Sequence, residues 1–98
     1  MSDEATVEVR IPTILRTYTG GATVVQVHIE HDATVAQLID ALEAAHPGIR
    51  ARVLDETGAL RRFVNIYVGE EDIRFDDGLA TAVVPGTSVS IIPAVAGG

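Results

Sequence analysis

Cysteine is absent from this sequence of 98 residues, and its absence excludes three kinds of chemistry. The chain has no disulfide framework, no thiolate metal site and no cysteine nucleophile of its own. Lysine is absent too, so all seven basic residues are arginines. Two explanations of the missing lysines are open: a genome that favours arginine, or a chain whose activated carboxyl group gains from having no internal amine or thiol to trap it.

Long hydrophobic runs are missing as well. No apolar stretch approaches the roughly 20 residues that a membrane-spanning helix needs. The segment Met1-Ser2-Asp3-Glu4 is acidic and lacks the basic-then-apolar layout of a signal peptide. We therefore expect a cytoplasmic protein without a membrane partner.

The sequence also lacks the motifs of an enzyme or a metal protein. No serine, histidine and acid stand in a triad-like setting, and no glycine-rich loop joins a strand to a helix. His28 and His31 are three residues apart, and in a strand positions i and i+3 point to opposite faces, so we expect these two histidines to share no metal. The acidic clusters at 70–72 and 76–77 lack the ligand spacing of a calcium loop. We expect no bound metal or cofactor.

What the chain does have is a composition suited to folding. Hydrophobic residues make up 47% and charged residues 21%, which is typical of one folded domain, here residues 1–98. The net charge is −7 at pH 7. An acidic chain repels the phosphates of nucleic acids, so we expect no nucleic-acid partner; the net charge alone favours a basic protein surface.

Alternation of apolar and polar residues predicts strands at 7–11, 25–29 and 63–68. The first two, joined by a flexible connection with a glycine pair, predict an antiparallel hairpin. Residues 69–72 are predicted as a turn and 73–75 as a short strand. A last strand is predicted at 88–92, and the state of residues 79–84 is left open.

One helix is strongly marked. Thr34 and Gln37 have the spacing of a capping box, in which each side chain pairs with the other residue's backbone N–H. Apolar residues then recur at helical spacing: Val35, Leu38, Ile39 and Leu42. The helix should end near His46, because Pro47-Gly48 cannot continue it. Residues 49–54 are predicted to add a short helical turn.

This order of elements predicts an α+β fold, the β-grasp: a mixed sheet of four to five strands with one main helix across one face. The first and last strands should lie side by side in the middle. The expected core consists of Val7, Val9, Val27, Leu38, Leu42, Val64, Ile66, Val89 and Ile91.

The C-terminal segment is the main candidate for function. Residues 94–98 follow the last strand and are expected to be flexible, since they are small. Gly97-Gly98 has no Cβ atoms, so it would thread a channel too narrow for other residues, together with Val95 and Ala96. The α-carboxylate of Gly98 is a poor electrophile, and its chemistry therefore needs an external enzyme that adenylates it with ATP.

A second candidate is an apolar patch on the outer face of the sheet. Phe63, Tyr67 and Ile92 are expected there, beside Pro93. Two interpretations are open, because single exposed apolar residues are ordinary, whereas three on one face beside a functional segment would bind a partner.

The chain resembles the ubiquitin-like sulfur carriers of the ThiS/MoaD family over nearly its whole length, most of all the CysO type that serves cysteine biosynthesis in actinobacteria. The resemblance is carried by "IPTILR" (11–16), "RFVNIYV" (62–68), "GLATA" (78–82) and "PAVAGG" (93–98). It implies a protein cosubstrate without enzymatic activity of its own. An E1-like adenylating enzyme would activate Gly98, and a sulfur donor would displace AMP to leave a thiocarboxylate.

The resemblance further implies two other partners. A pyridoxal-phosphate-dependent cysteine synthase would let the sulfur add to an aminoacrylate, and a C-terminal metalloprotease would release cysteine. The same carrier chemistry in thiamine, molybdopterin or natural-product synthesis is an alternative. A ubiquitin-like protein modifier, joined to lysines of other proteins, is another.

Overall fold

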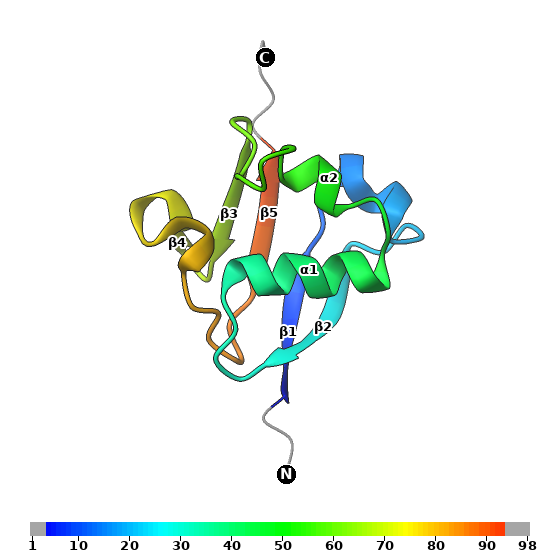
Figure 1. Cartoon of the computed structure of the whole chain (residues 1–98). Helices are drawn as coiled ribbons and strands as arrows, with labels where there is room; N and C mark the ends of the chain where they lie inside the picture. Colours follow the sequence, from blue (N-terminus) through cyan, green and yellow to red (C-terminus); the bar gives the residue numbers. More distant parts are fainter. Residues whose placement is uncertain (1–3, 94–98) are drawn as a thin grey trace.

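The protein, seen in a computed structural model that describes residues 4–93, is a five-stranded mixed sheet with one long helix across one face (Figure 1). The strand order is β2-β1-β5-β3-β4. This is the β-grasp that the sequence predicts. Within the described residues, no helix has the length and apolar character to cross a membrane.

The first two strands form the predicted hairpin. β1 (Glu4–Arg10) pairs antiparallel with β2 (Val24–Glu30), with Val7 opposite Val27. Both valines are buried, at 0% and 4% exposure, and the polar residues between them face the other side of the sheet. The alternation read from the sequence therefore sets which side of the hairpin joins the core.

The connection between these strands differs from the prediction. In place of a flexible link it contains a 3-10 helix, η1 (Thr13–Tyr18), whose Leu15 is buried. The Thr19 hydroxyl then closes the loop by hydrogen bonding to the carbonyl oxygens of Arg16 and Ala22, at 3.2 and 2.9 Å. A buried side chain and these side-chain bonds order the segment, and neither leaves a periodic signal in the sequence.

The main helix is α1 (Val35–Ala45), and its capping box is confirmed. The Gln37 backbone N–H donates to the Thr34 hydroxyl oxygen at 3.3 Å, and the Thr34 backbone N–H donates to the Gln37 side-chain oxygen at 2.8 Å. The helix ends at Ala45 with His46 as its C-cap, which confirms the predicted end near His46. Its apolar stripe packs on the sheet, with Leu38 and Leu42 only 2% and 1% exposed.

The short helix α2 (Arg50–Val53) is held by a carboxylate. Glu43 accepts backbone N–H groups from Gly48, at 3.0 and 3.1 Å, and from Arg50, at 2.9 Å. The Gly48 bonds, followed by the Arg50 bond, lower the pKa of Glu43 below its ordinary value. Gly48 has φ of +102°, and a Cβ there would lie 2.9 Å from a Tyr18 ring carbon, so glycine is required.

The last strand, β5 (Val89–Pro93), runs through the middle of the sheet. It pairs in parallel with β1 and antiparallel with β3 (Val64–Val68). The prediction that the first and last strands are adjacent is therefore confirmed. All nine residues of the predicted core are buried.

The prediction for residues 69–75 is right for the turn at 69–70 and wrong for residues 71–75. Gly69, at φ +64°, and Glu70 form a tight turn, so that β4 (Glu71–Asp72) already pairs with β3. The Asp72 carboxylate then accepts the Arg74 backbone N–H at 2.9 Å and starts a 3-10 helix, η2 (Ile73–Phe75), where a strand was predicted. A second 3-10 helix, η3 (Gly78–Ala80), follows in the stretch whose state the sequence left open.

Candidate functional site

The candidate site is the surface around Pro93, the last residue of β5. Strand β5 is buried on its core side by Val89 and Ile91, and its last residue, Pro93, pairs with Val64 at the start of β3. The predicted functional residues Val95, Ala96, Gly97 and Gly98 lie outside the described residues. The site is therefore described through the surface around Pro93, which we call the exit face.

The predicted apolar patch is only partly a single strand face. Ile92 is 45% exposed and pairs with Asn65, while Tyr67 is half-buried and pairs with Ser90. Ile92 and Tyr67 are thus diagonal neighbours on the outer face of the sheet. Ile92 lies outside the core, as the sequence indicated.

Phe63 lies elsewhere than the pattern suggests. Strand β3 begins at Val64, so Phe63 belongs to the preceding turn and strand alternation does not fix its direction. Its side chain is 52% exposed and lines a surface hollow together with Asp55, Arg61 and Arg62. Two of the three patch residues therefore share the sheet face, and the third lies at its margin.

Two hollows flank Pro93, and neither was foreseen from the sequence. The outer hollow, about 470 Å³, is lined by Arg10 and Arg16, by Ile92 and by Pro93 itself. The inner hollow, about 500 Å³, lies on the other side of Pro93 and includes Ile14, which is 67% exposed. Both hollows join apolar surface to arginine side chains, and together they make up the exit face.

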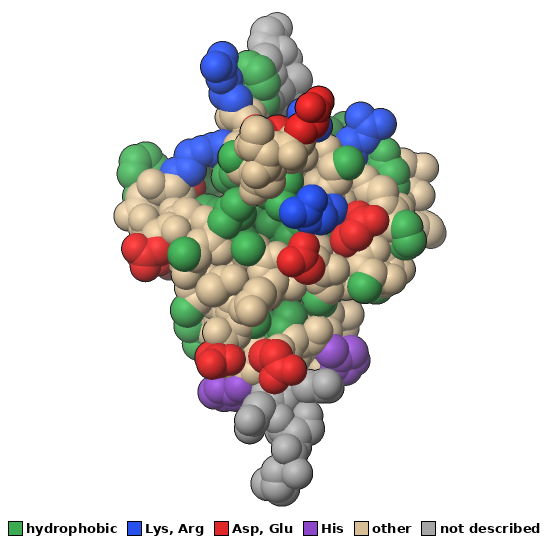
Figure 2. Space-filling view, in the orientation of Figure 1, with side chains coloured by type: hydrophobic (Ala, Val, Ile, Leu, Met, Phe, Trp, Pro, Cys, Tyr) green, Lys and Arg blue, Asp and Glu red, His purple; other side chains and the backbone are tan. Residues whose placement is uncertain are grey.

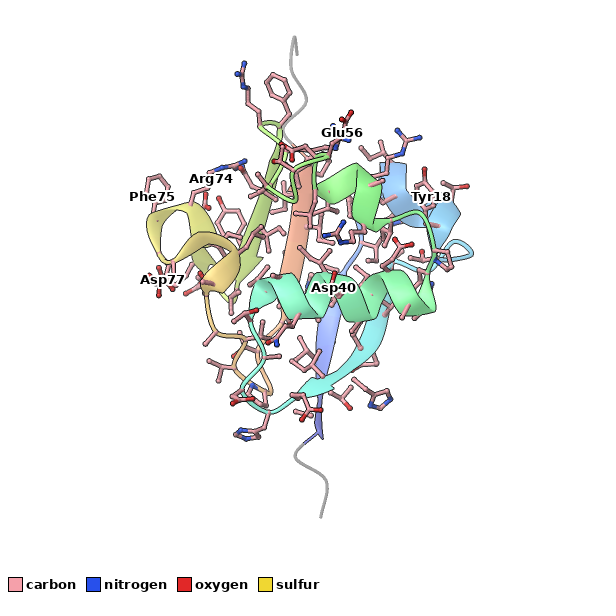
Figure 3. The ribbon with its side chains drawn as sticks, in the orientation of Figure 1. Tyr18, Asp40, Glu56, Arg74, Phe75 and Asp77 are labelled. Atoms are coloured by element: carbon pink, nitrogen blue, oxygen red, sulfur yellow. The ribbon has the colours of Figure 1, made fainter. Side chains whose placement is uncertain are left out.

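Three of the four arginines that line these hollows are held by hydrogen bonds. Arg16 Nε donates to the Ile11 carbonyl oxygen at 3.1 Å, and Arg61 Nε donates to the Ala51 carbonyl oxygen at 2.9 Å. Arg52 Nε donates to the Tyr18 hydroxyl at 2.7 Å, with its guanidinium carbon 5.9 Å from the ring centroid. Figure 3 labels Tyr18 on η1, beside α2.

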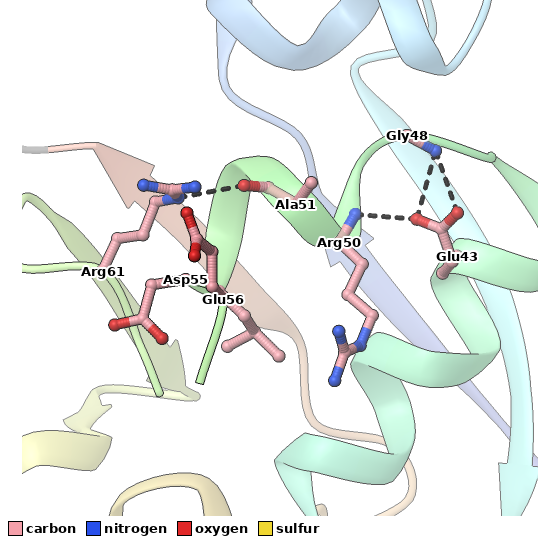
Figure 4. Close-up of a pocket in the computed structure, with 8 residues that line it drawn as sticks. Glu43, Gly48, Arg50, Ala51, Asp55, Glu56 and Arg61 are labelled. Atoms are coloured by element: carbon pink, nitrogen blue, oxygen red, sulfur yellow. Dashed lines mark hydrogen bonds between the residues drawn. The ribbon is translucent and has the colours of Figure 1, made fainter. Parts of the chain in front are cut away.

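A further hollow of about 360 Å³ lies beside α2 (Figure 4), and two of its three carboxylates, those of Glu43 and Asp55, accept hydrogen bonds from the protein itself. Glu43 accepts the backbone N–H groups described above. Asp55 accepts from the Thr57 hydroxyl at 2.6 Å, the Thr57 N–H at 2.8 Å and the Ala59 N–H at 3.1 Å. The Thr57 side-chain bond, followed by its backbone bond, lowers the pKa of Asp55. Glu43 and Asp55 thus hold the loops around α2 in place, and their hydrogen bonds need no ligand to explain them.

Metal binding has no geometric basis in residues 4–93, where no three His, Cys, Asp or Glu side chains cluster. His28 and His31 are both exposed on either side of the end of β2. The chemistry available at the exit face is that of guanidinium groups, exposed apolar side chains and the chain segment that follows Pro93.

The central β5, flanked by β1 and β3 and crossed by α1, defines a ubiquitin-like β-grasp protein. A model of the ThiS family matches residues 9–98, and the chain belongs to that family.

Named relatives agree with this assignment. The chain is 52% identical to "Sulfur carrier protein CysO" of Mycobacterium tuberculosis, covering 94% of this chain and 98% of that protein. Among solved structures, it is similar to a chain of the Amycolatopsis orientalis BexX/CysO complex, with 50% identity, a TM-score of 0.84 and coverage of 94% and 99%. SAMP1 of Haloferax volcanii is also similar, at 30% identity, with a TM-score of 0.80 and coverage of 95% and 99%.

Proposed function

We propose that this chain is a sulfur carrier, with the α-carboxylate of Gly98 as the group that carries the sulfur. The observation that supports this most is the 52% identity to a protein named as a sulfur carrier, over 98% of that protein's length. The family match also extends through Gly98, so it includes the residue to which the chemistry is assigned.

The chemistry follows from the properties of a carboxylate. At neutral pH it is anionic and resists attack, so it must first be activated. One carboxylate oxygen attacks the α-phosphorus of ATP, and pyrophosphate leaves. A sulfur nucleophile then attacks the acyl carbon, and AMP leaves with that oxygen. With sulfide as the donor, the product is a thiocarboxylate and the net change is one oxygen replaced by one sulfur.

The described residues contribute the strand that leads to the chain end and the surface that binds the activating enzyme. Strand β5 pairs with β1 at Val89 and Ser90 and with β3 along its whole length, so that Pro93 lies opposite Val64 at the end of the sheet. Activation is assigned to an E1-like adenylating enzyme that brings ATP, and the chain is its protein cosubstrate. The binding energy comes from the exit face, where Ile92 offers exposed apolar surface, with the half-buried Tyr67 as its diagonal neighbour on the sheet and Phe63 exposed at the margin.

Cysteine biosynthesis is the pathway we propose. In it, a pyridoxal-phosphate-dependent synthase accepts the sulfur, and a C-terminal metalloprotease restores Gly98. The similarity to a chain of a BexX/CysO complex supports a carrier that docks on a protein partner. Thiamine, molybdopterin and natural-product synthesis are the alternatives within the same carrier chemistry.

Intact-mass spectrometry tests the carrier proposal. The protein is incubated with ATP, sulfide and the E1-like enzyme of the same cell, and a variant lacking Gly98 is the control. We expect a mass increase of one oxygen-to-sulfur exchange in the C-terminal peptide, absent from the control. Incubation of the product with the synthase and O-phosphoserine should then add one cysteinyl group, whereas no such adduct would redirect the proposal to another pathway.

A protein modifier is the second candidate, because SAMP1, a "small archaeal modifier protein", is 30% identical with a TM-score of 0.80. The chain has no lysine, so an isopeptide must form on a different protein. Affinity-tagged protein, expressed in its own cell, separates the two. Covalent conjugates on lysines, lost in the variant without Gly98, favour a modifier; their absence favours a carrier.

A further inference from the structure

We propose that the exit face is a basic docking surface and that the partner which receives the chain end presents an acidic rim to it. The proposal rests on the proposed function, since it describes how a partner finds Gly98. In Figure 2 most of the blue side chains lie toward the C-terminal end and the histidines lie near the N-terminal end, while acidic side chains are spread over the whole face. We call the basic group the arginine collar. It consists of Arg10, Arg16, Arg52, Arg61, Arg62 and Arg74.

The collar surrounds Pro93 on both sides of the sheet. Arg10 and Arg16 line the outer hollow with Pro93, and Arg52 and Arg61 line the inner hollow with the same residue. These four arginines come from separate parts of the sequence. The parallel pairing of β1 with β5 brings the first pair to the end of β5, and α2 with the loop before β3 brings the second pair.

The remaining two arginines extend the collar along the start of β3. Arg62 lines a hollow with Phe63 and Val64, and Val64 is the residue that pairs with Pro93. Arg74 reaches back from η2, where its guanidinium donates to the carbonyl oxygens of Arg61 at 2.8 Å and Arg62 at 3.3 Å (Figure 3). Six of the seven arginines of the chain therefore belong to one end of the molecule.

Three guanidinium groups of the collar are held in place by internal hydrogen bonds and still have N–H donors to offer. Arg16, Arg52 and Arg61 each use Nε for an internal hydrogen bond. A guanidinium has five N–H donors, and its paired terminal donors match a carboxylate in two-point geometry. Because the internal bonds already restrict these side chains, less conformational entropy is lost when a carboxylate binds.

The local charge is opposite to the net charge of −7. Four acidic side chains are paired with a collar arginine or line a hollow with one: Glu8, 3.9 Å from Arg10, and Glu43, Asp55 and Glu56, which share a hollow with Arg61. Six positive groups against these four leave the exit face positive, while the rest of the surface is strongly negative. This separation of charge orients an approaching partner as well as attracting it. The partner surface that meets the exit face should therefore be negatively charged.

The composition of the face favours a protein over a nucleic acid. Exposed Ile14, Ile92 and Phe63 lie among the arginines, at 67%, 45% and 52% exposure. Arginines with aromatic and aliphatic side chains are typical of protein interfaces. The negative remainder of the molecule would repel a phosphate backbone. The partner that fits has an apolar centre that meets these side chains and carboxylates around it.

Single arginine-to-glutamine variants provide a charge-matched test. Arg62→Gln and Arg10→Gln change the collar at exposed side chains that donate no hydrogen bond to residues 4–93. Arg50→Gln, which removes the same charge beside Asp40 on the α1 side, is the control. The probe is the E1-like enzyme of the same cell. Calorimetry gives Kd over a range of salt concentrations, and mass spectrometry gives the thiocarboxylate formed.

We expect Kd to rise about 3-fold for each collar variant and less than about 1.5-fold for Arg50→Gln, with weaker binding of the wild type as salt increases. Equal effects of Arg50→Gln and Arg62→Gln, or binding that salt leaves unchanged, would overturn the proposal. If the protein binds the enzyme but no thiocarboxylate forms, the carrier chemistry is refuted. The salt dependence of Kd would then still test the docking face. No binding at all would refute both, and salt-sensitive binding of labelled duplex DNA that only the collar variants lose would assign the face to nucleic acid.

Discussion

The two sides of β5 differ in how their residues are used. On the side covered by α1, Val89 and Ile91 are 1% and 4% exposed and belong to a continuous apolar core. On the other side, Ile92 is 45% exposed and lines a hollow with arginines. One strand thus anchors the fold with alternate residues and presents a surface with the others. Stability and recognition are therefore separable by mutation along a single strand.

The largest effect should come from the core side. Leu42→Ala removes a buried side chain, 1% exposed, from the α1 stripe, and we expect a loss of about 2–5 kcal/mol in the free energy of unfolding. Urea unfolding measures it. Val84→Ala, at an apolar residue that is 56% exposed, is the control and should change stability by less than about 0.5 kcal/mol. A loss below about 1 kcal/mol for Leu42→Ala would show that the core is not close-packed there.

Ile92→Asp should give the reverse result. Its side chain is exposed, so we expect the free energy of unfolding to change by less than about 1 kcal/mol. A carboxylate in an apolar contact should nevertheless weaken binding to the E1-like enzyme by about 10-fold. Calorimetry and urea unfolding measure the two quantities. Val84→Asp is the control for an added surface charge, and an Ile92→Asp protein that unfolds would place Ile92 in the core.

A smaller, pH-dependent effect is expected at Glu43. Its pKa is lower in the folded protein than in the unfolded chain, so its contribution to stability is present above the unfolded pKa and is lost as pH falls through the folded pKa. Glu43→Gln should therefore be less stable than the wild type at pH 7. The gap should narrow on acidification, as urea unfolding at several pH values will measure. A gap that is the same at low pH would assign the effect to packing instead.

The parts of the fold that depend on residues close together in the sequence were predicted correctly. The alternation in β1 and β2 and the capping box from Thr34 to Gln37 depend on near neighbours, and all three are confirmed. The strand predicted at 73–75 is a 3-10 helix instead, because two local features outweigh its apolar residues. These are the tight turn at Gly69 and the capping of the 3-10 helix by Asp72.

The candidate site was predictable only in part. Ile92 was assigned to the outer face because it alternates with Ile91 in one strand. The arginine collar was missed because its members span residues 10–74, and only the parallel β1–β5 pairing and the α2 connection bring them to one end. The net charge of −7 predicted a basic partner surface, which is the wrong sign for a face rich in arginine. A net charge does not say where on the molecule the charged residues lie.

Transfer of labelled oxygen tests the central claim most directly, that Gly98 is activated as an acyl adenylate and then carries sulfur. Protein in which both oxygens of the Gly98 carboxylate are isotopically heavy is incubated with ATP, sulfide and the E1-like enzyme, and the mass of the released AMP is measured by mass spectrometry. We predict one heavy oxygen in AMP for each thiocarboxylate formed, because that oxygen leaves with AMP when sulfur attacks the acyl carbon. Unlabelled AMP, or sulfur found anywhere other than the C-terminal peptide, would contradict the account.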